Sequence, residues 1–138
     1  MNIQVLYYSK TGKTKKVAVA IASALNVHEQ NIRDTKLDEG SFVFLGSGCY
    51  GGKPGKDMMN FIMNNDFTTR NVALFGTSGS GEGKEVTEME ESLNSKGANI
   101  IDRFFCKGKF LLVNRGRPNA EDLEGAKEFA RNAISAYE

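Results

Sequence analysis

The 138-residue chain contains no tryptophan, one histidine and two cysteines, and each of these scarcities excludes a class of site. Cys49 and Cys106 are too few for a disulfide framework or a cysteine metal motif, so we expect reduced thiols. With His28 as the single histidine, the chain lacks the residues for a histidine-rich metal site. Catalysis of the Ser-His-Asp or Cys-His type would depend on His28 alone, and we expect this histidine on the surface.

Neither strong charge nor a long apolar run is present. The formal net charge is +1, whereas proteins that bind nucleic acid usually carry a strong basic footprint, so we expect no nucleic-acid partner. No apolar run approaches the roughly 20 residues of a membrane span. The segment Met1–Ile3 leads into the first predicted strand without the layout of a signal peptide. We therefore expect a cytoplasmic protein with a single domain over residues 1–138.

Apolar runs alternate with helical patterns along the chain, as in a parallel sheet covered by helices. Near-continuous apolar runs predict strands that are buried, at 3–8, 41–46 and 71–76. A fifth strand is predicted at 99–105, and a weaker one at 27–32. Apolar residues at helical spacing predict helices over 13–25, 56–64, 85–96 and 120–137. This order predicts a three-layer, doubly wound α/β domain with a five-stranded parallel sheet. Such sheets bind ligands at the carboxyl ends of their strands.

The segment Ser9-Lys10-Thr11-Gly12-Lys13-Thr14 joins the first predicted strand to the first predicted helix. The first N–H groups of a helix have no partner within it and carry partial positive charge, so this turn is suited to a phosphate. Its three hydroxyls add donors, and its glycine lets the backbone approach an anion closely. The P-loop of nucleoside triphosphatases also needs a glycine five residues before the Gly-Lys pair, and Tyr7 stands there instead.

Two more loops rich in glycine and hydroxyls follow inner strands, at 47–55 and 77–83. The run Gly46-Ser47-Gly48-Cys49-Tyr50-Gly51 fits the dinucleotide pattern G-x-G-x-x-G. However, it follows the third strand, and no helix opens directly after it, so the context that this pattern requires is missing. Three such loops at one edge of a sheet, the first of them suited to phosphate, indicate a ligand site.

These segments resemble the short-chain flavodoxins over essentially the whole chain. Residues 9–14 fit the family's phosphate signature Ser/Thr-x-Thr-Gly-x-Thr. Leu45-Gly46-Ser47 and Leu74-Phe75-Gly76-Thr77 resemble the family's later strand ends, and the second leads to Gly79-Ser80-Gly81-Glu82-Gly83. The resemblance implies the strand order 2-1-3-4-5, bound FMN, and an electron carrier whose partners are redox proteins, namely a reductase donor and an acceptor enzyme.

The resemblance also implies which residues would bind FMN. The first loop would hold the 5′-phosphate through Ser9, Lys10, Thr11, Gly12, Lys13 and Thr14. The second loop would cover one face and the N5 edge of the isoalloxazine through Ser47, Gly48, Cys49, Tyr50, Gly51 and Gly52. The third loop would meet the other face and the pyrimidine edge through Thr77, Ser78, Gly79, Ser80, Gly81 and Gly83. Tyr50, the only aromatic residue of the three loops, is our candidate for stacking on the ring, and we expect Cys49 to be a small buried residue.

Two features depart from the usual flavodoxin pattern. Ser80 lies where the third loop usually has an aromatic residue, so one flavin face is expected to be open. The chain is near neutral where flavodoxins are strongly acidic, and several lysines lie near the predicted site: Lys10, Lys13, Lys53, Lys56 and Lys84. Nearby cations stabilise an anionic reduced flavin, which predicts a less negative potential for the second electron than in acidic flavodoxins.

These departures leave two other functions open. The first is an FMN-dependent reductase or dehydrogenase of a planar substrate of the quinone or tetrapyrrole type. The second is a flavin-free binding or regulatory module, because one fold supports many functions.

Overall fold

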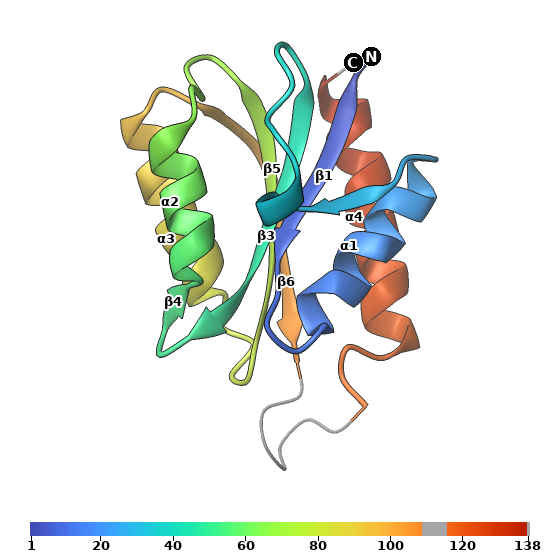
Figure 1. Cartoon of the computed structure of the whole chain (residues 1–138). Helices are drawn as coiled ribbons and strands as arrows, with labels where there is room; N and C mark the ends of the chain where they lie inside the picture. Colours follow the sequence, from blue (N-terminus) through green and yellow to red (C-terminus); the bar gives the residue numbers. More distant parts are fainter. Residues whose placement is uncertain (109–115, 138) are drawn as a thin grey trace.

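The computed structural model describes residues 1–108 and 116–137 (Figure 1). In this part of the chain the strands are β1 (Ile3–Tyr8), β2 (Glu29–Asn31), β3 (Phe42–Tyr50), β4 (Lys53–Pro54), β5 (Asn71–Ser78) and β6 (Asn99–Lys107). The helices are α1 (Lys13–Ala24), α2 (Lys56–Asn64), α3 (Lys84–Ser95) and α4 (Ala120–Tyr137), with a short 3-10 turn, η1 (Ile32–Asp34).

The main sheet is parallel and runs in the order β2-β1-β3-β5-β6. This is the predicted order 2-1-3-4-5 once the two-residue strand β4 is set aside. Strand β4 pairs antiparallel with the end of β3, where Cys49 faces Pro54 and Tyr50 faces Lys53. The predicted fold class is therefore confirmed, with β4 as an addition at the sheet edge that carries the loops.

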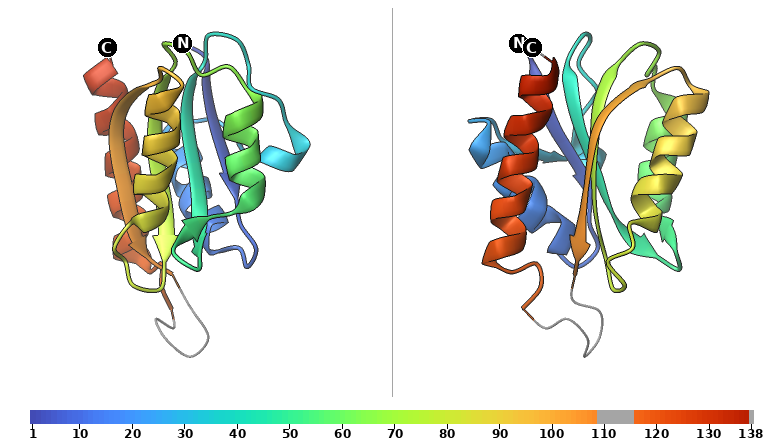
Figure 2. Two further views of the ribbon diagram at one scale, coloured as in Figure 1. Left: turned by 90° about the vertical axis from the view of Figure 1, so that its left-hand side faces the viewer. Right: turned by 180° about the vertical axis from the view of Figure 1, so that it is seen from behind.

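Helices cover both faces of the sheet, α1 and α4 on one face and α2 and α3 on the other (Figures 1 and 2). Neighbouring residues of one strand enter opposite layers: Val5 packs in the core beneath α1 and α4, and Leu6 packs in the core beneath α2 and α3. Both are fully buried. A strand with a core on each side has no solvent face, which is why the inner strands are apolar at nearly every position.

The predicted bounds agree with the structure where side chains enter the core and differ where the strands leave it. Strand β1 and helices α2 and α4 have the predicted bounds. Strands β3 and β5 continue past their apolar runs, since Gly48 pairs with Thr77 in the ladder between them. Strand β2 is shorter than predicted. Among the described helices, none has the length and apolar character needed to cross a membrane.

Candidate functional site

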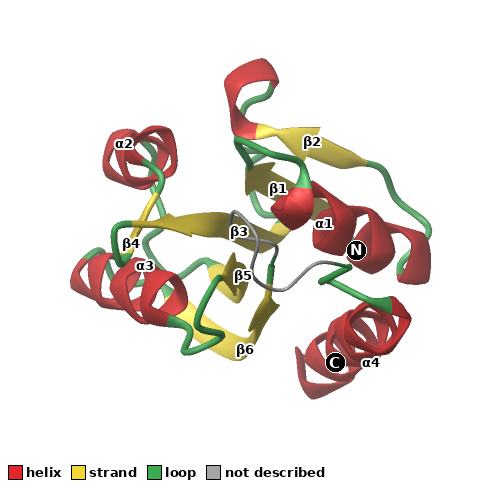
Figure 3. Cartoon of the chain, turned by 90° about the horizontal axis from the view of Figure 1, so that it is seen from below, coloured by secondary structure: helices red, strands yellow, loops and turns green. Residues whose placement is uncertain are grey.

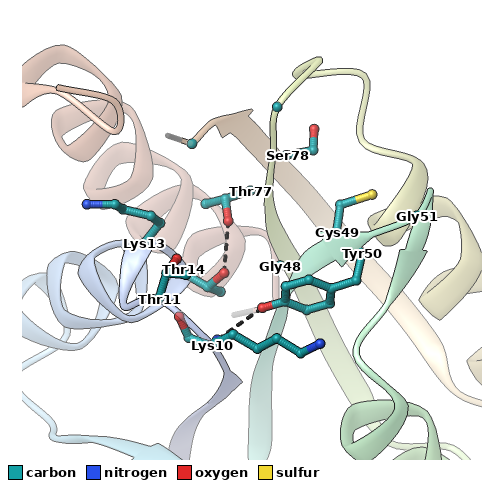
Figure 4. A pocket seen from close by; sticks show the side chains of 13 residues that line it. Lys10, Thr11, Lys13, Thr14, Gly48, Cys49, Tyr50, Gly51, Thr77 and Ser78 are labelled. Carbon is teal, nitrogen blue, oxygen red and sulfur yellow. Dashed lines mark hydrogen bonds between the residues drawn. The ribbon is translucent and has the colours of Figure 1, made fainter. Parts of the chain in front are cut away.

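Three loops meet at the carboxyl ends of β1, β3 and β5, at the lower edge of Figure 1, which faces the viewer in Figure 3. The strand register places Tyr8 beside Ser47 and Gly48 beside Thr77, so that the three strands end side by side. Between the loops lies a cavity of about 450 Å³ (Figure 4). It is lined by Ser9, Lys10, Thr11, Lys13, Thr14, Gly48, Cys49, Tyr50, Gly51, Thr77, Ser78, Gly79 and Gly108.

The first loop ends at the N-terminus of α1 and leaves that end of the helix open. Gly12 is the N-cap residue, with a φ of 88° in the left-handed region that favours glycine. The Ser9 hydroxyl accepts a hydrogen bond from the Gly12 N–H at 2.9 Å, which closes the turn and leaves the hydroxyl proton for a further bond. No side chain of the described residues caps α1 there, so its first N–H groups face the cavity as an anion site.

A pair of hydroxyls joins the first loop to the third at the floor of the cavity. The Thr14 and Thr77 Oγ1 atoms are 2.8 Å apart, and both residues are buried (Figure 4). A hydrogen bond between two hydroxyls uses one proton, so the pair keeps a second O–H for a ligand. This donor and the N-terminus of α1 both face the same cavity.

The Tyr50 side chain lies across the cavity beside the first loop (Figure 4). Its hydroxyl accepts a hydrogen bond from the Lys10 backbone N–H at 3.1 Å, and the Lys10 Nζ lies 4.5 Å from its ring centroid. A Cβ atom at Gly48 would lie 2.6 Å from this hydroxyl, so a side chain there would displace the Tyr50 hydroxyl from its place. Burial raises the pKa of the Tyr50 phenol, which keeps the ring neutral. Tyr50 thus gives the cavity a neutral aromatic wall next to its anion site.

Six of the predicted site residues do not line the cavity: Gly12, Ser47, Gly52, Ser80, Gly81 and Gly83. Ser47 is fully buried behind the second loop, where its hydroxyl donates to the Gly48 carbonyl and accepts from the Gly55 N–H at 3.0 Å. These bonds join the two ends of the loop, so Ser47 shapes the site from behind. Gly12 and Gly83 are the N-cap residues of α1 and α3, and both have a positive φ, which glycine adopts readily.

The structure also adds a cavity residue that the sequence analysis did not name. Gly108 follows β6, and its N–H donates to the Ser78 carbonyl at 2.9 Å. The order 2-1-3-4-5 places β6 next to β5, so the end of this strand was the only sequence feature that could have pointed to Gly108. The segment at 109–115, which follows it, lies outside the described residues.

The two cysteines and the single histidine differ in their exposure. Cys49 and Cys106 are free thiols, and burial raises the pKa of each, that of Cys106 to about 12. A protonated thiol is a poor nucleophile. The prediction that Cys49 is buried was wrong, because Cys49 is half-buried and lines the cavity. His28 is exposed, as predicted. Within residues 1–108 and 116–137, no cluster of metal-ligating side chains is found.

The dinucleotide-like run also has a clear place in the fold. Residues 46–50 belong to β3, so this run is not a turn between a strand and a helix. Instead, the site combines an anion-binding end, an aromatic wall and glycine-lined backbone. Such a site can hold a phosphorylated molecule that carries a planar ring.

Known proteins are similar to this chain in sequence and in fold. A family model described as "Flavodoxin domain" matches residues 4–113. "Uncharacterized protein MJ0298" of Methanocaldococcus jannaschii is 32% identical over 148 residues, which cover 97% of this chain and 99% of that protein. "Flavodoxin-like domain-containing protein BilS" of Clostridioides difficile is 34% identical over 121 residues, covering 79% of this chain and 67% of BilS. A solved flavodoxin from the domain Archaea has a TM-score of 0.79 at 24% identity, with both chains covered in full, which shows a shared fold.

Proposed function

Since this chain belongs to the flavodoxin family and its cofactor is accordingly FMN, we propose that it carries electrons between redox partner proteins. The observation that supports this most strongly is the convergence of three loops on one cavity with an anion site at one end and an aromatic wall beside it. FMN has a phosphate at one end and a planar ring at the other. The residues present therefore match the two ends of the cofactor.

The phosphate end of the site fits a dianion. The open N-terminus of α1, the Ser9 hydroxyl and the Thr14–Thr77 pair all offer donors to one side of the cavity. We assign the 5′-phosphate to the backbone and hydroxyls of residues 9–14, and the ammonium groups of Lys10 and Lys13 add positive charge from the same loop. Hydrogen bonds between charged and neutral partners are the strong ones, so this end supplies most of the affinity.

The ring end of the site fits a flat apolar group. Tyr50 forms one wall, and the absence of a Cβ atom at Gly48 leaves room for the Tyr50 hydroxyl beside the first loop. Gly51, with a φ of 63°, offers backbone that can change conformation at little cost. We assign the ring faces to Tyr50 and to the backbone of 77–79. When bound, FMN supplies the one-electron and two-electron chemistry, and these residues orient the ring and limit its contact with water.

A titration of the unloaded protein tests the phosphate end. We expect FMN to bind at least about a hundredfold more tightly than riboflavin, which lacks the phosphate, since charge-assisted hydrogen bonds contribute roughly 1.5–3 kcal/mol each. Thr14→Val should weaken FMN binding about tenfold and leave riboflavin binding unchanged. Thr87→Val, on the exposed side of α3, is the matched control and should change neither. Equal affinities for FMN and riboflavin would show that the first loop does not hold the phosphate.

The carrier role is tested by turnover of the FMN-loaded protein. NADPH alone should not reduce it at a catalytic rate, because the glycine run in β3 lacks the strand-to-helix context of a dinucleotide site. Addition of a flavodoxin reductase, with cytochrome c as acceptor, should give rapid electron flow. Fast oxidation of NADPH by the protein on its own would instead indicate a dehydrogenase.

A further inference from the structure

A second cavity, of about 410 Å³, lies beside the first and shares Lys10 and Tyr50 with it. It is lined by Tyr8, Lys10, Arg33, Tyr50, Lys53, Pro54, Gly55, Lys56 and Asp57. Its walls thus come from the ends of β1 and β3, from η1 and β4, and from the first turn of α2. Small-molecule sites usually measure about 300–1,000 Å³, so the volume suits a compact ligand.

Positive charge dominates this second cavity. Its lining holds four cationic side chains and one carboxylate, although the whole chain has 18 basic and 17 acidic residues. The carboxylate, Asp57, accepts a hydrogen bond from the Arg33 Nε at 2.8 Å and so compensates only that guanidinium. Lys53 is exposed and pairs with the partly exposed Glu88 at 3.7 Å, and ion pairs at the surface contribute little. Lys56 forms no ion pair among the described residues, so the cavity has positive charge available for an anion.

Two tyrosine rings form the apolar part of the second cavity. Tyr8 and Tyr50 pack edge to face, with centroids 6.0 Å apart. Each ring has a cation over it: the Arg33 guanidinium carbon is 5.3 Å from the Tyr8 centroid, and the Lys10 Nζ is 4.5 Å from the Tyr50 centroid. Aromatic walls favour a planar apolar body, and the cations beside them favour negative substituents on that body.

We propose that the second cavity binds a small planar molecule with anionic substituents, which exchanges electrons with FMN in the first cavity. The electron exchange rests on the function proposed above, whereas the binding does not. With a quinone as the ligand, the quinone would take up two electrons and two protons to become the hydroquinone. Both electrons and one proton would come from the anionic reduced FMN, which is thereby oxidised, and the second proton would come from solvent. Tyr50 is the wall shared by the two cavities, so the quinone ring would lie next to the flavin site.

Binding of anthraquinone-2,6-disulfonate, a planar quinone with two negative groups, tests the proposal. The FMN-loaded, oxidised protein is titrated by calorimetry and by NMR shifts of the Tyr8 and Tyr50 rings. We expect saturable binding that Lys53→Gln/Lys56→Gln weakens at least about tenfold, since two charge-assisted contacts are lost. Neither lysine lines the first cavity, so the affinity for oxidised FMN should stay unchanged. The matched control, Lys127→Gln/Arg131→Gln on α4, removes the same charge and should shift the affinity by less than about twofold.

A kinetic measurement tests the electron transfer from reduced FMN to the quinone. Photoreduced protein is mixed with the disulfonate under anaerobic conditions, and the doubly substituted cavity variant should be reoxidised more slowly than the wild type at limiting disulfonate. Absence of binding, or equal binding by the wild type and the Lys53/Lys56 variant, would overturn the proposal while leaving FMN binding intact. If FMN itself fails to bind, the proposed function fails, and the same titration of the unloaded protein and its two variants still decides what the second cavity binds.

Discussion

At the scale of single residues, the Glu85 carboxyl is the least expected feature of the molecule. It is fully buried in the first turn of α3, and neither of its oxygens has a hydrogen-bond partner among the described residues. A Cβ atom at Gly76 would lie 2.5 Å from Oε2, so the glycine makes the space that the carboxyl occupies. Burial raises the pKa of Glu85 to about 7. The two titratable groups that sense its charge, Cys49 on β3 and Cys106 on β6, have pKa values raised by burial and stay neutral around pH 7.

The raised pKa of Glu85 predicts that the protein loses stability as the pH rises. In the unfolded chain the carboxyl has its ordinary pKa of 4.5, so between about 4.5 and about 7 the native state binds a proton that the unfolded state releases. The free energy of unfolding is therefore highest below about 4.5 and falls until the native carboxyl ionises near 7. Glu85→Gln, which cannot ionise, should remove a loss of roughly 2–3 kcal/mol between about pH 5 and about pH 8. Urea unfolding of the FMN-free wild type and variant at these two pH values measures this change in the free energy of unfolding.

The control for this measurement lies on the same helix. Glu91→Gln removes an exposed carboxyl of α3 and should keep the pH dependence of the wild type. Identical pH profiles for the wild type and Glu85→Gln would show that the buried carboxyl is not the origin of the effect.

The burial of Glu85 could not be predicted from the sequence. Val86, Met89 and Leu93 form the apolar stripe of α3, and Glu85 lies one residue before it. Periodicity marks the residues that are apolar and inward, and a carboxylate beside the stripe is usually solvated. The same reasoning failed for Ser47, because a hydroxyl that faces a ligand and one that bonds the backbone behind a loop are alike in sequence.

At the scale of elements, the close approach of β3 and β5 determines where the loops emerge. Gly46 and Phe75 are register partners, and a Cβ atom at Gly46 would lie 2.1 Å from the Phe75 ring. The ring is fully buried, so it has little room to move away. One residue further along β3, Ser47 pairs with Tyr8 on one side and with Gly76 on the other. Gly46 therefore holds the register that brings the three loops together.

Gly46→Ala should destabilise the protein by about 1–3 kcal/mol, because the methyl group overpacks against a ring that cannot yield. The cost should shrink in a Phe75→Leu background, where the smaller side chain leaves space, and a double-mutant cycle in urea isolates this coupling. If Gly46→Ala costs the same in both backgrounds, the glycine is required for a reason other than the ring.

The elements that could be predicted are those with a side-chain pattern that repeats. The apolar run of β1 and the stripes of α2 and α4 gave the observed bounds, because burial determines their residues. Strand β4 was missed, since its two residues pair through backbone and carry no pattern. The sequence pattern places the ends of β3 and β5 in loops for the same reason, because glycine and hydroxyl residues continue the ladder there without an apolar run.

At the scale of the whole molecule, the net charge of +1 conceals an uneven distribution. The second cavity collects cations, whereas α3 carries several carboxylates and has Lys53–Glu88 and Arg103–Glu90 as links to its neighbours. Composition predicts the sum of the charges. Their placement follows from which loops meet at the sheet edge, and this depends on the strand order. The electrostatic field at the cofactor site is thus a property of the fold, and it can be tested by moving charge without changing the site itself.

The charges beside the flavin site predict the direction of a change in redox potential. Reduction by the second electron adds negative charge to the cofactor, and nearby cations stabilise that state, so loss of Lys53 and Lys56 should make the second potential more negative. Lys127→Gln/Arg131→Gln, on α4 in the opposite layer, removes equal charge at a greater distance and should shift the potential less. Spectroelectrochemical titration of the FMN-loaded proteins measures both. The shift should shrink as salt rises from about 0.01 M to about 1 M, because the Debye length falls from about 30 Å to about 3 Å. Equal potentials in the wild type and the Lys53/Lys56 variant at low salt would mean that the field at the ring is set by the first loop and the backbone alone.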